Sequence, residues 1–161
     1  MTRKIIYLLV ALLMPGIIFV FLKFFGKNEF TIPVYYEQGV AEVAGTCAYR
    51  YPTPYRVPDS IMSRVRKDGE PEVVLVIANP SNQIKANLSR LKEQVNDYHV
   101  SFASEAELPW DAWFGCFFFL HKPWSAVLID SENQIRGYYD PETREEVDRL
   151  AVEMKILLMQ Y

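Results

Sequence analysis

The sequence predicts an α/β domain, with a central mixed sheet and flanking helices, behind one N-terminal transmembrane helix. Three observations support this prediction. An uncharged, mostly apolar run extends from Ile5 to Leu22. A continuous apolar stretch at residues 73–78 is followed by a helical pattern of apolar residues. The C-terminal part of the chain then shows two more strand-like stretches and a closing helical pattern.

The length and charge of the chain limit its organisation and partners. Its 161 residues suffice for one membrane segment and one domain of ordinary size. Residues 1–27 contain basic side chains and no acidic ones, whereas residues 28–161 hold the other 13 basic and all 20 acidic residues, a formal charge of −7. An acidic domain repels phosphate backbones, so the sequence predicts that the protein does not bind nucleic acid.

The apolar run favours a retained membrane anchor over residues 1–27. About 20 helical residues, each rising 1.5 Å, cross the hydrocarbon core of about 30 Å. The alternative is a cleaved signal peptide, whose apolar stretch is shorter and ends in small residues. Here the run is followed by Lys23, Phe24 and Phe25, which offer no such cleavage site. Basic residues flank both ends of the run, so charge alone does not orient it.

Residues 28–58 are predicted to be an extended linker rich in tyrosine and proline. Repeated prolines exclude a helix and suit a chain that lies across a surface or forms an edge strand. The folded domain is then expected over residues 59–161.

The clearest predicted element of the domain is a central strand at residues 73–78, because a continuous apolar run is typical of a strand buried on both faces. Asn79 is the predicted N-cap of the following helix, with Pro80 at its first position. The apolar face of this helix is expected to comprise Ile84, Leu88, Leu91 and Val95.

Three further strands are predicted at residues 99–103, 125–130 and 134–139, the last two forming a hairpin. Residues 105–114 are expected to be a loop or a short helix. Asp140 is the predicted N-cap of the closing helix. The apolar face of that helix is expected to comprise Val147, Leu150, Ala151, Met154 and Leu158. With right-handed crossovers, the order strand, helix, strand, loop, hairpin, helix gives a thioredoxin-like fold.

Three stretches resemble the Sco/SenC family of thioredoxin-fold proteins. They are LIDSENQIRGYYDPETREEVDRLAVEMKILL at residues 128–158, VVLVIANPSNQIKANLSRL at residues 73–91, and YRVPD at residues 55–59. Members of this family are membrane-anchored and are associated with copper delivery to cytochrome c oxidase. The resemblance implies a periplasmic domain on a single-pass anchor. It also implies an envelope or inner-membrane partner, such as an oxidase assembly component.

The chain departs from this family at the metal motif. Alignment with the family's CxxxC motif places Ile77 and Ser81 at the two cysteine positions. Copper(I) favours soft sulfur ligands, and dithiol exchange requires two thiols. We therefore expect a degenerate motif, with no metal, no cofactor and no catalytic residue. His121 lies near the family's histidine position and is a weak candidate ligand, but a packed or capping role is favoured.

The two cysteines, Cys47 and Cys116, match no CxxC, zinc or copper spacing. Outside the cytoplasm a structural disulfide between them is the favoured prediction. Two buried thiols and a reversible redox pair remain alternatives.

Taken together, these patterns predict a non-catalytic, membrane-anchored protein that acts by binding another protein, and the resemblance implies that this occurs in respiratory oxidase assembly. Two alternatives remain open. One is an envelope thiol-disulfide protein that works through Cys47 and Cys116. The other is a structural membrane protein with no connection to copper.

Overall fold

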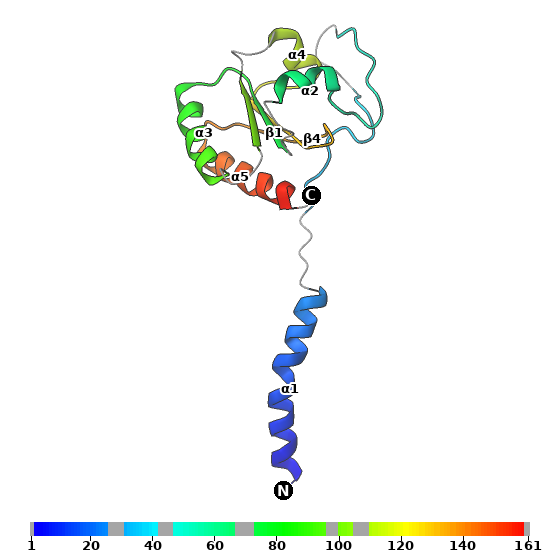
Figure 1. Ribbon diagram of the computed structural model, residues 1–161, viewed down its shortest axis with the longest axis vertical. Helices are drawn as coiled ribbons and strands as arrows, with labels where there is room; N and C mark the ends of the chain where they lie inside the picture. Colours follow the sequence, from blue (N-terminus) through cyan, green and yellow to red (C-terminus); the bar gives the residue numbers. More distant parts are fainter. Residues whose placement is uncertain are drawn as a thin grey trace. The chain divides into compact units, whose positions relative to one another are not determined.

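The computed structural model (Figure 1) divides into two compact units, Met1–Thr31 and Ile32–Tyr161, which are considered separately. The described residues are 2–25, 31–41, 47–66, 73–95, 100–104 and 110–159. The predicted boundary between anchor and linker, at residues 27 and 28, lies outside them.

The first unit contains helix α1 (Thr2–Phe25), which continues through Pro15. Much of its described surface is apolar: Leu12 is 78% exposed and Phe19 is 70% exposed. Among the described residues, no helix meets the length and hydropathy required of a membrane span. The membrane anchor therefore stays a prediction.

The second unit is a mixed α/β domain, as the sequence predicts. Its elements are α2 (Asp59–Val65), β1 (Val73–Ile77), α3 (Asn82–Gln94), β2 (Val100–Ser104), α4 (Trp110–Cys116), β3 (Ala126–Ile129), β4 (Ile135–Tyr139) and α5 (Arg144–Met159). The four strands lie in the order β2-β1-β3-β4. Strand β1 is parallel to β2 and antiparallel to β3, which is antiparallel to β4. This topology is compatible with a thioredoxin-like fold.

Strand β1 is buried on both faces, which confirms the prediction from its continuous apolar run. Successive side chains of a strand point to opposite faces of the sheet. Val73, Leu75 and Ile77 accordingly join one hydrophobic cluster, and Val74 and Val76 join another. The domain therefore has two cores, one on each side of the sheet.

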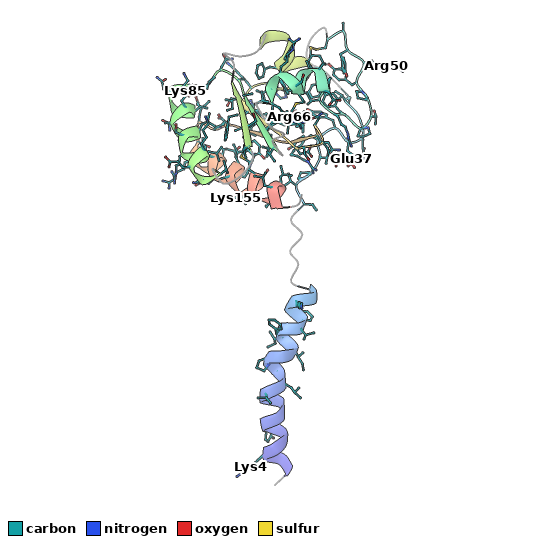
Figure 2. The ribbon with its side chains drawn as sticks, in the orientation of Figure 1. Lys4, Glu37, Arg50, Arg66, Lys85 and Lys155 are labelled. Atoms are coloured by element: carbon teal, nitrogen blue, oxygen red, sulfur yellow. A yellow bond between two sulfur atoms is a disulfide. The ribbon has the colours of Figure 1, made fainter. Side chains whose placement is uncertain are left out.

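Helices α3 and α5 form the layer on the first face (Figure 1). All the apolar positions predicted for these two helices are buried. The side-chain amide of Asn87 on α3 donates hydrogen bonds to the carbonyl oxygens of Pro141 (2.7 Å) and Glu142 (3.2 Å), so the start of the closing segment is fixed to α3. Lys85 lies on the outer side of this layer (Figure 2).

The predicted starts of both helices were wrong. Helix α3 is capped by Ser81, whose Oγ accepts a hydrogen bond from the Ile84 amide at 3.1 Å. Before α5, Thr143 Oγ1 accepts one from the Glu146 amide at 3.3 Å. The predicted caps, Asn79 and Asp140, instead lie in the preceding turns. Asn79 has a positive φ of 44°, a conformation outside the usual range of N-cap residues.

The second face is covered by α2, α4 and the tyrosine-rich segment that precedes α2. The segment is held by backbone hydrogen bonds from Tyr35 N to Ile135 O (2.9 Å) and from Val57 N to Asn133 O (2.9 Å). Tyr55 is completely buried. The segment therefore packs as part of the domain. Helix α2 was not among the predicted elements, although Ile61, Met62 and Val65 form its buried side.

The turn between β3 and β4 is organised around the buried carboxylate of Asp130. This carboxylate accepts hydrogen bonds from the amides of Glu132 (2.9 Å) and Gln134 (2.8 Å), and pairs with Arg136 at 2.6 Å. Arg136 also donates to the carbonyl oxygen of Ile32 at 2.9 Å. Asp130 therefore connects the hairpin with the first residue of the domain.

Arg66 approaches the same turn from the end of α2. Its Nη2 donates to the carbonyl oxygens of Asp130 and Ser131, both at 3.1 Å, and Figure 2 labels this half-buried residue. The hairpin turn is therefore bound both to α2 and to the start of the domain.

Gly137 provides a test of the packing on the first face. A Cβ at this position would lie 2.8 Å from Cζ and 2.9 Å from Cε2 of the buried Tyr139 ring. Gly137→Ala should therefore lower the free energy of unfolding by about 1–3 kcal/mol, because the ring has little room to move. Urea unfolding followed by tryptophan fluorescence measures this. The exposed Val152→Ala is the control and should change stability by less than about 0.5 kcal/mol. Equal stability of the two variants would contradict the tight contact.

Candidate functional site

A groove of about 890 Å³ lies at the end of β1, where both layers of the domain meet. Its walls come from the β1–α3 turn, α4, the loop before β3 and the segment before α5. The lining residues are Ala78, Asn79, Ile84, Phe114, Gly115, Leu120, His121, Lys122, Pro123, Trp124, Ser125, Asp140 and Glu142. A groove of this volume is within the range of small-ligand sites.

Backbone hydrogen bonds fix the loop before β3 against the sheet. The Ala78 amide donates to Ser125 O at 2.8 Å, and the Ser125 amide donates to Tyr139 O at 3.0 Å. The Lys122–Pro123 peptide bond is cis. The Ser125 hydroxyl is buried and has no hydrogen-bond partner among the described residues. The groove wall is therefore well defined and contains one unsatisfied polar group.

Charged and aromatic side chains give the groove a mixed character. Lys122 belongs to one wall, and Asp140 and Glu142 belong to another. Trp124 adds a half-buried aromatic ring. The described residues contain no group of three or more histidine, cysteine or acidic side chains that could hold a metal ion. The groove therefore supplies apolar contacts, hydrogen-bonding groups and charged side chains of both signs.

Ile77 and Ser81 lie at opposite ends of the β1–α3 turn and have structural contacts. Ile77 is 2% exposed and belongs to the core beneath α3 and α5. Ser81 caps α3. Each therefore contributes to packing or to helix initiation.

His121 is exposed at the rim of the groove. Its Nδ1 lies 3.1 Å from the carbonyl oxygen of Lys122, and its own carbonyl accepts a hydrogen bond from the Trp124 amide at 3.0 Å. The residue thus takes part in the tight turn before Pro123. Because the side chain is exposed, the predicted packed role is not observed, and the role of His121 as a weak candidate ligand stays a prediction.

Cys47 and Cys116 form a disulfide, with their Cα atoms 5.6 Å apart. The favoured prediction for the pair is therefore confirmed. The bond joins the tyrosine-rich segment to the last residue of α4. Both cysteines are half-buried. Because these are the only two cysteines of the chain, no free thiol remains for the β1–α3 turn.

Three tyrosine hydroxyls bind the chain at Cys116 and the two residues that follow it, a feature that the sequence did not predict. Tyr51, Tyr55 and Tyr138 donate to the carbonyl oxygens of residues 116, 117 and 118, at 3.0, 2.7 and 2.9 Å respectively. Burial raises the pKa of Tyr55 and Tyr138 well above the usual value for tyrosine. No local pattern relates residues so distant in sequence. The hydroxyls hold the end of α4 and thereby one wall of the groove.

Comparison with known protein families and with curated proteins finds no match for this chain. The resemblance to the Sco/SenC family therefore stays a prediction from the quoted residues.

The capping role of Ser81 can be tested directly. Ser81→Ala should lower the free energy of unfolding by about 1 kcal/mol, because the amide at the start of α3 loses its acceptor. Ser89→Ala is a matched control within the same helix, since this exposed serine bonds only to the Lys85 carbonyl of its own helix. That change should be neutral or slightly stabilising. If Ser81→Ala has no larger effect than Ser89→Ala in urea unfolding, the assigned cap is incorrect.

Proposed function

We propose that this chain is a membrane-anchored, thioredoxin-like protein of the Sco/SenC type that has lost the copper and dithiol motif and acts by binding another protein. The observation that carries the proposal is the β1–α3 turn, where Ile77 packs in the core and Ser81 caps a helix. The sheet order β2-β1-β3-β4 supports the fold assignment. Both cysteines are engaged elsewhere in a disulfide.

The proposed anchor is α1. At 1.5 Å per residue, its 24 residues extend about 36 Å, compared with about 30 Å for a hydrocarbon core. Residues 5–22 contain no charged side chain. A periplasmic location of the domain is supported by the disulfide, because such bonds persist in oxidising compartments.

The groove at the end of β1 is the proposed place of partner binding. It combines apolar and aromatic walls with a buried, unsatisfied hydroxyl on Ser125 that a partner could satisfy. Such a site suits recognition without chemistry. The proposed partner is an envelope or inner-membrane protein of respiratory oxidase assembly, as the family resemblance implies.

Copper(I) binding tests the proposal. The full chain in lipid nanodiscs should not compete with a copper(I)-specific chelator, because the β1–α3 turn has no soft sulfur donor. Chelator absorbance during titration measures the competition. A variant with both Cys47→Ser and Cys116→Ser is the control for copper bound by sulfur elsewhere in the chain. Stoichiometric, tight binding by the wild-type chain that persists in this variant would refute the proposed loss of function.

The disulfide also supports a second candidate function, a thiol-disulfide protein, because Cys116 immediately follows two residues of the groove wall. Thiol titration in glutathione buffers separates the two functions. A structural bridge should stay closed at about −200 mV, since structural disulfides have potentials below about −300 mV. A bridge that opens and closes reversibly at about −200 mV would favour the redox function.

A further inference from the structure

A row of aromatic side chains lies beside the disulfide, and we call it the aromatic row: Tyr51, Tyr49, Phe117 and Trp113. Successive ring centroids are 5.2 Å apart between Tyr51 and Tyr49, 5.2 Å between Tyr49 and Phe117, and 6.5 Å between Phe117 and Trp113. The tyrosines come from the linker segment and the other two rings from α4 and the residue after it. The row therefore bridges two parts of the chain that are far apart in sequence.

The aromatic row is only partly covered. Tyr49 is 36% exposed, and the other three rings are half-buried. The neighbouring Phe118 and Phe119, by contrast, are buried in the core. Phe118 and Phe119 therefore complete the core, whereas Trp113 and Phe117 reach the surface.

The positively charged side chain of Arg64 lies at one end of the aromatic row. The guanidinium of Arg64, on α2, lies 5.4 Å from the centroid of the Trp113 ring. Arg64 is exposed and forms no ion pair with a carboxylate among the described residues. Other arginines of the domain are paired, such as Arg56 with Glu132 and Arg136 with Asp130. The guanidinium of Arg64 therefore gives this aromatic surface a positive charge, although the domain as a whole is acidic. Such a surface complements a partner that carries a negative charge.

The disulfide fixes the two halves of the aromatic row relative to each other. Cys47 lies two residues before Tyr49, and Cys116 lies one residue before Phe117. The Tyr51 hydroxyl adds a bond to the carbonyl oxygen of Cys116. A surface that is already ordered loses little conformational entropy on binding. Tyrosine, tryptophan and arginine are also the residues that dominate binding energy at protein interfaces.

We propose that the aromatic row and Arg64 form a docking surface for a protein segment that presents an apolar side chain next to a carboxylate. The apolar side chain packs on Trp113 and Phe117, and the carboxylate pairs with Arg64. This inference rests on the proposed role in protein binding, but it uses side chains that do not line the groove.

Two short fluorescein-labelled peptides provide the test. Each has a central leucine and phenylalanine, flanked by glutamates in one peptide and by lysines in the other. Binding to the full chain in lipid nanodiscs is followed by fluorescence anisotropy. The glutamate peptide should bind at least tenfold more tightly than the lysine peptide. Trp113→Ala should weaken the glutamate peptide about tenfold, and Arg64→Glu should reverse the preference.

Two control variants locate the binding. Arg90→Glu changes the same charge on α3, which covers the other face of the sheet, and should leave both affinities within about twofold. Trp124→Ala removes the tryptophan of the groove and should also leave the affinity of the chain for both peptides within about twofold. Equal binding of the two peptides, or no binding of the glutamate peptide, overturns the proposal. A loss in Trp124→Ala without a loss in Trp113→Ala would overturn it too, while leaving partner binding at the groove in place. The copper(I) result is independent of all these outcomes.

Discussion

The fold depends on a central strand that is apolar at every position. No residue of β1 is more than 2% exposed, so each face of the sheet requires its own apolar layer. Helices α3 and α5 provide one layer. The other is built from α2, α4 and an irregular tyrosine-rich segment. The groove lies beyond the end of β1. There the two layers that flank the sheet continue, but the strand between them does not.

The tyrosine-rich segment has no regular ladder of backbone hydrogen bonds, so other interactions must hold it against the sheet. Three features do so: the Cys47–Cys116 disulfide, the tyrosine hydroxyls that bind the end of α4, and the Arg136 bond to Ile32 O. Arg136 in turn is paired with the buried Asp130, and removal of either partner of such a pair leaves an uncompensated charge in the interior. The segment is thereby an integral part of the second core.

In this construction the two cysteines are bonded to each other, and neither belongs to the turn between β1 and α3. Ile77 and Ser81 use that turn for packing and for helix initiation. The cysteines stabilise the opposite layer, where they order the aromatic row and one wall of the groove. A domain built in this way offers two preformed surfaces, which is consistent with the proposed role in recognition.

The sequence by itself determined the strands, the apolar faces of α3 and α5, and the α/β class, because these depend on local periodicity and burial. It also favoured the disulfide, through the number of cysteines and the expected compartment. It did not locate the helix caps, because Asn79–Pro80 and Asp140–Pro141 satisfy the same local preferences in a turn as at a helix start. The tyrosine bonds to residues 116–118, the groove and the aromatic row were decided only by the tertiary structure. Each of them joins side chains from distant segments, and their proximity follows from the packing of the layers on β1.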